Sequence, residues 1–310
     1  MIQILDFNWK KDNNEFFPIM KTLNTDNLEI ATLKLGADVT VFNYKLSLEK
    51  FCCGYRENKF WHKCLNANER NIGLRIIKDS DYQCFDCEKR EGFKSAFFYR
   101  QVPNESMDKH LEQTHYIYLA YFLPNIIKVG TVAESRKGFR QIEQDALFYS
   151  YIAESDGFKI QSLERQISKL TNTTETVRSS QKFKNLNSKI NIDLAKRELK
   201  SKIIEIQQKF QDTEFADWLY KMESIKYIDT TENPRIYYPT EKVSLLDVKE
   251  FKNDKYIPLV GGYIGLRGNY LLFKNEEKIL SFNTNFLVGR KIDYLAEYSY
   301  KQEVDQLGLI

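Results

Sequence analysis

The first residues that could do chemistry are cysteines. All five cysteines of this 310-residue chain lie between positions 52 and 87. Cys84 and Cys87 form a C-x-x-C pair, a spacing that lets two thiolates bind one metal ion around a tight turn. Cys64 offers a third thiolate. A redox-active pair is disfavoured because no βαβ pattern surrounds it. The pattern favours a tetrahedral metal site over a set of unrelated buried thiols.

The fourth ligand is either Cys52 or Cys53, with His62 as a further alternative. We favour Cys52 because Gly54 follows it closely and permits a knuckle-like turn. Zinc is the usual occupant of such a site, and four protein ligands make it structural rather than catalytic. The predicted zinc ion would hold a loop-rich region, which should unfold when the ion is lost. Its predicted ligands are Cys52, Cys64, Cys84 and Cys87.

The second group of candidate residues follows two short apolar runs, 116–123 and 126–129, which predict strands joined by a Pro-Asn turn. A basic segment with Arg136 and Arg140 comes next, and a helical pattern starts near residue 138. A further helix is predicted over residues 158–170, with its apolar stripe at Ile160, Leu163, Ile167 and Leu170. Glu164 lies beside this stripe, so it can reach into a cleft while the helix packs.

The remaining pattern predicts three domains. Residues 28–48 read as strands, 186–210 as a long amphipathic helix and 212–228 as another helix. From residue 227 on, short β-runs alternate with Gly-rich turns, which is typical of a small sheet or barrel. A polar connector precedes the central strands. The predicted domains are an N-terminal β region with the zinc segment (1–110), a core with a basic helical extension (111–226) and a C-terminal β module (227–310).

Composition narrows the function classes. A hydrophobic fraction of 42% with 29% charged residues is typical of a globular chain, and no apolar run approaches the roughly 20 residues needed to span a bilayer. The first residues lack a signal-peptide layout, so we expect a cytoplasmic protein without membrane contact. The net charge is only +3, so any nucleic-acid binding must depend on a local basic patch.

The central motifs carry a resemblance. "YIY" at 116–118 and "KVG" at 128–130, then an arginine and a glutamate on successive helices, resemble the GIY-YIG nuclease core. The chain also resembles an uncharacterised prokaryotic family of unknown function that has a four-cysteine segment, "YLA…KVG…EQGA" and a C-terminal Gly-rich module. Here these blocks read "CCG", "YLAYF", "KVG", "EQDA" and "GGYIGLRGNYLLF". Lys128 stands where the founding pattern has its second tyrosine, and Asp145 replaces a glycine of the branch pattern.

The resemblance implies an α+β or α/β fold, with a small mixed-sheet GIY-YIG-like core between the β/zinc region and the β module. It also implies a metal-dependent endonuclease in which Tyr118, Lys128, Arg140 and Glu164 are catalytic. Glu164 would hold Mg²⁺ or Mn²⁺, and Arg140 would clamp the phosphate oxygens. Tyr118 would position the water, or accept its proton if its pKa is lowered. Lys128 would supply further positive charge.

A basic run follows the core and predicts a phosphate-binding surface whose affinity falls steeply with salt. With Arg136 from the core, the predicted nucleic-acid-binding residues are Arg178, Lys182, Lys184, Lys189, Lys196 and Arg197. The expected partner is nucleic acid, with DNA favoured over RNA. Two alternatives stay open. One is a zinc-stabilised nucleic-acid-binding protein without cleavage activity, and the other is a protein–protein adaptor in which the basic run is solvated surface.

Overall fold

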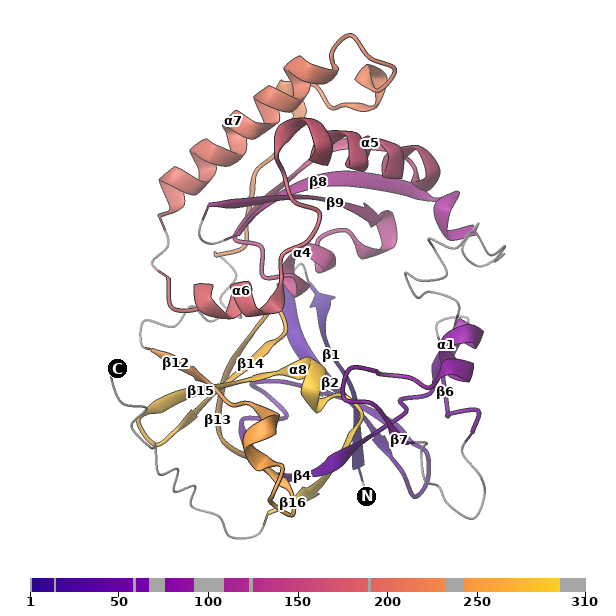
Figure 1. The fold of residues 1–310 in the computed structure, drawn as a ribbon, viewed down its shortest axis with the longest axis vertical. Coiled ribbons are helices and arrows are strands. Elements are labelled where there is room, and N and C mark those ends of the chain that lie inside the picture. The colour runs from indigo at the N-terminus through magenta and orange to yellow at the C-terminus, as the bar shows by residue number, and fades with distance from the viewer. Residues whose placement is uncertain are drawn as a thin grey trace.

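The computed structural model describes residues 2–13, 15–57, 60–66, 76–91, 109–122, 125–188, 191–231 and 242–295. The fold is mixed α/β and consists of two lobes, which are stacked in Figure 1. The central lobe comprises residues 109–231 and contains the long helices. The sheet lobe combines the described residues before 92 with residues 242–295. No helix in these described ranges is long and apolar enough to cross a membrane.

The sheet lobe contains a ten-stranded mixed sheet to which both ends of the chain contribute. The strand order is β12-β15-β14-β13-β4-β16-β1-β2-β3, with β7 also paired to β4. Only β12 and β15 pair in parallel within this sheet. The strands are β1 (Ile2–Asp12), β2 (Glu15–Asn24), β3 (Ile30–Lys34), β4 (Val41–Phe51), β7 (Ile76–Ile77), β12 (Val243–Leu245), β13 (Ile257–Arg267), β14 (Tyr270–Asn275), β15 (Lys278–Asn283) and β16 (Arg290–Tyr294).

One hydrophobic core serves both ends of the chain. It includes Ile4, Phe42 and Leu46 from the N-terminal strands and Leu271 and Phe282 from the C-terminal ones. The short helix α8 (Thr284–Leu287) and the 3₁₀ helix η4 (Val248–Phe251) complete this lobe. The strands predicted as an N-terminal region and those predicted as a C-terminal module therefore pack as one body.

The central lobe is built on a four-stranded sheet in the order β11-β10-β8-β9. Its strand pairs are all antiparallel, as expected where β8 and β9 are joined by a short turn, and a parallel bridge between Lys128 and Thr174 extends the edge. Its strands are β8 (Thr114–Phe122), β9 (Ile126–Ala133), β10 (Phe148–Asp156) and β11 (Ile228–Asp229). Its helices are η1 (Glu134–Arg136), α4 (Phe139–Glu143), α5 (Gly157–Thr171), α6 (Ser179–Asn185) and α7 (Ile192–Phe210).

Side-chain alternation along β8 explains how this sheet packs. Ile117, Leu119 and Tyr121 join the core beneath α5 and α7, whereas Tyr116 and Tyr118 belong to a separate cluster. The two helices bury most of the stripes predicted from their sequences. The buried members are Ile160, Leu163 and Ile167 on α5, and Ala195, Leu199, Ile203, Ile206 and Phe210 on α7. Leu170 and Ile192, at the ends of these stripes, are exposed because they lie where the helices extend past the sheet core.

The predicted helix over 212–228 is wrong. The segment forms only two 3₁₀ turns, η2 (Ala216–Trp218) and η3 (Met222–Ser224). Leu219 instead makes an antiparallel bridge to Ala153 of β10, and the backbone N–H of Tyr220 donates to the carbonyl of Ile152 at 2.8 Å. Pairing with the strand gives these backbone groups partners that a helix would otherwise supply.

The two lobes meet through α4, α6 and the turn after β13 (Figure 1). Asp145 follows α4 and accepts two hydrogen bonds from Arg267, both at 3.0 Å, with the side chains 8% and 2% exposed. Asp145 has a φ of 65°, a left-handed conformation that explains why the branch pattern has glycine here. Phe139 of α4 packs edge-on against Phe16 of β2, with ring centroids 5.1 Å apart.

Candidate functional site

The sequence-predicted metal ligands come together in the cysteine segment, residues 52–91. Cys52, Cys64, Cys84 and Cys87 are buried, and their sulfur atoms all lie within 4.8 Å of one another. Sγ of Cys64 and Sγ of Cys84 are 3.8 Å apart. Four sulfurs at the usual Zn–S distance of about 2.3 Å in a tetrahedron are separated by about 3.8 Å. The group therefore has the spacing that a tetrahedral zinc ion requires, and it could hold a metal ion such as zinc.

Backbone amides support the same interpretation. The N–H groups of Gly54 and Cys84 donate to Sγ of Cys52 at 3.4 and 3.2 Å, and the N–H of Leu65 donates to Sγ of Cys87 at 3.4 Å. Such bonds favour a charged thiolate over a neutral thiol. Burial raises the pKa of Cys87 to about 12, so the bare thiol is neutral at pH 7 and a cation is needed to keep the thiolate.

The two alternative ligands lie outside the group. Cys53 is buried, but its Sγ faces the backbone carbonyls of Ile4 and Phe51 at 4.0 and 3.9 Å. The ring of His62 stacks on Tyr55 with centroids 4.9 Å apart. The turn at Gly54, with a φ of 79°, brings β5 (Tyr55–Glu57) and β6 (Phe60–His62) beside α1 (Phe85–Glu91). Cys52 is therefore the cysteine that shares the site with the C-x-x-C pair.

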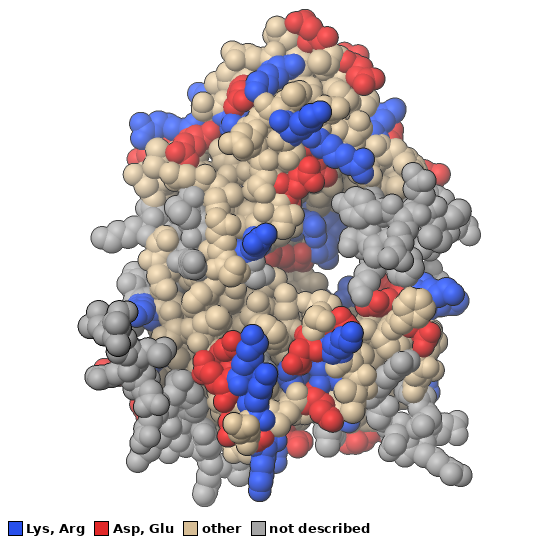
Figure 2. Space-filling view, in the orientation of Figure 1, with Lys and Arg blue, Asp and Glu red and all other residues tan. Residues whose placement is uncertain are grey.

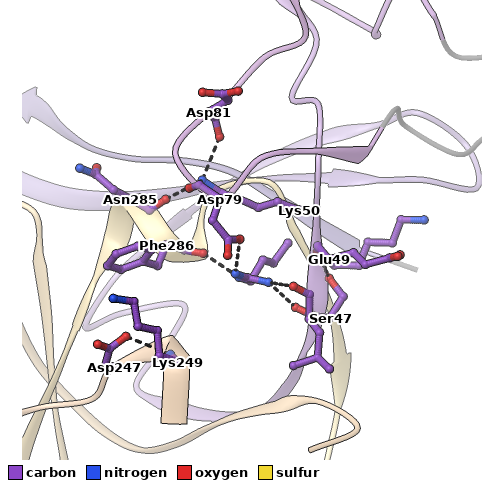
Figure 3. A network of polar contacts seen from close by, with 12 residues as sticks. Ser47, Glu49, Lys50, Asp79, Asp81, Asp247, Lys249, Asn285 and Phe286 are labelled. Atoms are coloured by element: carbon purple, nitrogen blue, oxygen red, sulfur yellow. Dashed lines mark hydrogen bonds and ion pairs between the residues drawn. The ribbon is translucent and has the colours of Figure 1, made fainter. Parts of the chain in front are cut away.

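Two buried cations join the cysteine segment to the large sheet (Figure 3). Lys50 of β4 donates from Nζ to the carbonyls of Asp79, Asp81 and Asn285 at 2.8–2.9 Å. Arg290 of β16 is fully buried and donates to the carboxylate of Asp79 at 2.8 Å. It also donates to the carbonyls of Phe286, Ser47 and Leu48. The hydrogen bonds of Lys50 and the ion pair of Arg290 therefore hold the loop at residues 79–81, which leads to Cys84.

The four residues predicted to be catalytic line one pocket of about 270 Å³ at the β9 edge of the central sheet, here called the site pocket. They come from four elements, with Tyr118 on β8, Lys128 on β9, Arg140 on α4 and Glu164 on α5. Tyr118 and Gly130 are directly opposite each other across the β8–β9 ladder. A Cβ at Gly130 would clash with the phenol of Tyr118, so glycine is what lets the ring lie across the edge strand.

Burial shifts the titration of three of these groups. It raises the pKa of Tyr118 to about 12, against the opposing charge of Arg140, and the hydroxyl donates to Oε1 of Gln144 at 3.0 Å. Tyr118 is therefore a hydrogen-bond donor, and the charge of Arg140 alone does not bring the pKa of Tyr118 below its ordinary value. Burial lowers the pKa of Lys128 to about 8 and raises the pKa of Glu164, a rise that the Lys128 charge partly offsets.

Several residues that line the site pocket were not predicted from the sequence. Glu175 lines the pocket and contributes its backbone carbonyl to Nζ of Lys128. It arrives there because the chain after α5 returns along β9, where Val129 and Thr174 are joined by a 2.9 Å backbone hydrogen bond. The other missed residues are Thr131, Gln161, Arg165 and Thr176. Gln144 could have been found from its position four residues after Arg140, on the same side of a helix.

The predicted phosphate-binding residues do not form one uniform surface. Arg178 and Arg197 are exposed, whereas Lys196 pairs with Asp229 at 3.5 Å. Lys182 is half-buried, with its ammonium group 5.4 Å from the Phe122 ring centroid. Arg136 pairs with Glu143 at 2.5 Å. The side chain of Lys184 and all of Lys189 lie outside the described residues. On the face in Figure 2, basic and acidic side chains are interspersed over the central lobe.

Comparison with known proteins gives a family and no function. No curated protein and no solved structure matches the chain. A family model with the description "Protein of unknown function (DUF2797)" matches residues 80–291, which include Cys84, Cys87, the site pocket and most of the C-terminal strands. The prediction of a family of unknown function is thus confirmed. The chain belongs to the DUF2797 family.

Proposed function

We propose that this chain is a metal-dependent nuclease of divergent GIY-YIG type that hydrolyses phosphodiester bonds, with DNA favoured over RNA as its substrate. The observation that carries the proposal is the site pocket itself. A tyrosine, a lysine, an arginine and a glutamate from four separate elements converge on it, in the order that the resemblance requires. A phosphate monoanion fits a pocket lined by Lys128, Arg140 and Arg165.

Glu164 is the residue that would hold the divalent cation. Its carboxylate is largely buried, and the neighbouring charge of Glu175 raises its pKa further. A bound cation would compensate both carboxylates, and Mg²⁺ commonly binds through one or two carboxylates while it keeps several waters. The metal would supply Lewis-acid polarisation of the phosphate oxygen.

The protein residues have separate tasks in the reaction. The water oxygen forms a bond to phosphorus, and the bond from phosphorus to the leaving sugar oxygen breaks; the water loses one proton to solvent and the leaving oxygen gains one. Arg140 is exposed at the pocket mouth, where it can hold two nonbridging oxygens. Because the Tyr118 hydroxyl donates its proton to Gln144, its oxygen can orient the attacking water by accepting a hydrogen bond from it. Lys128 both anchors the 174–176 segment and adds positive charge.

The four-cysteine cluster has a structural part in this proposal. With zinc bound by Cys52, Cys64, Cys84 and Cys87, every tetrahedral position is filled by protein, so no position is open for substrate. The ion would join three chain segments that lie far apart in the sequence. Through Lys50 and Arg290, the same segment is held on the large sheet.

A cleavage assay tests the function directly. Mixed DNA and RNA substrates are incubated at low salt with Mg²⁺ or Mn²⁺, using wild type, Glu164→Gln, Arg140→Ala and the control Lys169→Ala, an exposed position on the same helix as Glu164. We expect wild type and Lys169→Ala to cleave, and losses of roughly 10²–10³-fold or more in the two site variants.

The other outcomes of this assay distinguish the alternative functions. Salt-sensitive binding without cleavage by wild type would move the chain to the nucleic-acid-binding class that lacks hydrolysis. Neither binding nor cleavage would favour the adaptor. Cleavage that Glu164→Gln retains would show that the hydrolysis occurs elsewhere or belongs to a contaminant.

A further inference from the structure

A second cavity, of about 230 Å³, adjoins the site pocket and is here called the histidine pocket. Thr131, Arg140 and Gln161 line both cavities, so the two lie side by side. The histidine pocket also contains His110 and His115, two of only three histidines in the chain. Their rings meet edge to face, with centroids 5.0 Å apart.

Both cavities have basic groups in their lining, but they differ in their carboxylates. The site pocket includes the carboxylates of Glu164 and Glu175, as a metal site needs. Among the described residues, the ionisable groups that line the histidine pocket are all basic: His110, His115, Arg136 and Arg140. Arg136 brings one carboxylate nearby through its ion pair with Glu143. Apart from this pair, the ionisable groups in the described lining are basic, so the pocket favours an anionic ligand.

The histidine geometry leaves a ring nitrogen for such a ligand. His115 is buried, and its Nδ1 lies 2.9 Å from the carbonyl of Gln113, so Nδ1 carries the proton and donates. This contact holds the ring in place between β8 and the start of α5, where Cε1 of His115 would lie 3.0 Å from a Cβ on Gly157. Nε2 is then the ring nitrogen with which His115 can contact a ligand in the pocket that it lines.

We propose that the histidine pocket binds the phosphate adjacent to the scissile one, so that Arg140 lies between two successive phosphates of one strand. This inference rests on the proposed function for its substrate class, but phosphate binding can be measured without cleavage. Thymidine 3′,5′-bisphosphate carries two phosphates on one sugar, one for each cavity, whereas thymidine 5′-monophosphate carries only one.

The test compares the affinities of these two nucleotides for the full chain, with its zinc retained and without added Mg²⁺. We expect the bisphosphate to bind wild type at least about tenfold more tightly, as one charge-assisted hydrogen bond provides. In His110→Gln this ratio should fall to near one, and in the control His62→Gln it should stay unchanged. An unchanged ratio in His110→Gln overturns the proposal.

Histidine ring resonances provide a readout that needs no variant. With bisphosphate, the ring protons of His110 and His115 should shift in wild type while those of His62 stay in place. Shifts absent from both pocket histidines overturn the subsite. If cleavage fails while the shifts and the affinity ratio hold, the nuclease proposal falls and the phosphate subsite stands. If cleavage depends on Glu164 but the ratio is unaffected, only the subsite falls.

Discussion

Gly130 is the residue on which the position of Tyr118 depends. The two are cross-strand partners, and the ring occupies the space where a side chain at position 130 would lie. Glycine in the interior of a strand weakens that strand because it has no side chain to pack. It often marks a place where another group approaches the backbone closely. In this pocket the group that approaches is the residue proposed to orient the reacting water.

We expect Gly130→Ala to displace the Tyr118 ring and to destabilise the protein by about 1–3 kcal/mol through overpacking. Gly262→Ala is the matched control, because the nearest atom to a Cβ there is the carbonyl oxygen of Lys274 at 4.0 Å. Thermal unfolding should show a lower midpoint for the first variant alone. Adding Tyr118→Phe removes the clashing oxygen and should restore part of the loss; strict additivity of the two changes would contradict the clash.

Lys128 gives the pocket a dependence on pH. Burial lowers its pKa to about 8, so its positive charge is present below that pH and is lost as pH rises through it. Without added Mg²⁺, oligonucleotide affinity should therefore decline from about pH 8 upward. Lys128→Arg keeps its charge over this range and should show no such decline. Affinity titrations between pH 7 and 10 measure this; parallel curves for the two proteins would exclude Lys128 as the titrating group.

At the scale of elements, the cysteine segment is a set of short pieces held by its side chains. Its strands β5 and β6 have three residues each, and α1 has seven. Elements this short do not persist by themselves in water. The sulfur group and the buried cations Lys50 and Arg290 supply the constraints instead.

Removal of one cysteine should therefore release a metal ion that the four cysteines hold. We expect Cys52→Ser to lose about one zinc ion per chain, as measured by elemental analysis, and to become sensitive to proteolysis within the segment. Cys53→Ser changes the neighbouring buried thiol and should keep its metal, because Cys53 faces carbonyls outside the group. Equal metal content in the two variants would refute the four-cysteine site.

Much of the element pattern could be predicted, and the exceptions have physical causes. The stripes of α5 and α7 were readable because one face of each helix packs on one sheet. Residues 212–228 have helical spacing too, but Leu219 pairs with Ala153 of β10 instead. That partner is distant in the sequence, so the local pattern could not indicate the pairing. In the site, the order of Tyr118, Lys128, Arg140 and Glu164 was readable from motifs. Glu175 was not, since it reaches the pocket only through the path of the chain after α5.

At the scale of the whole molecule, the contact between Asp145 and Arg267 joins the lobes. Both groups are nearly inaccessible to water, and Arg267 donates two hydrogen bonds to the Asp145 carboxylate. A Cβ added to Gly268 would lie 2.9 Å from Cβ of Asp145. The turn of the C-terminal Gly-rich motif therefore packs against the residues that follow α4. The position of Arg140, on the same helix, thus depends on a strand from the other lobe.

Asp145→Ala should remove the carboxylate that pairs with the buried charge of Arg267 and cost about 3–5 kcal/mol of unfolding free energy. The control is Glu205→Ala, which removes the partner of Lys202 and Lys209 on the surface and should cost at most about 1 kcal/mol. Chemical denaturation with separate probes for each lobe would measure both effects. A loss for Asp145→Ala no larger than for the control would show that the lobes are joined by other contacts.

The shared sheet has a consequence for biosynthesis. Ser47 on β4 and its partner Arg290 are 243 residues apart in the chain, and the two long strands that flank β4, β13 and β16, come from the C-terminal part. At 5–20 residues per second, a ribosome needs roughly 10–50 s to make the intervening chain. During that time β4 lacks β13 and β16, while the whole central lobe emerges and can fold. The nascent chain should therefore depend on chaperones for its first strands, and completion of the site should wait for its last ones.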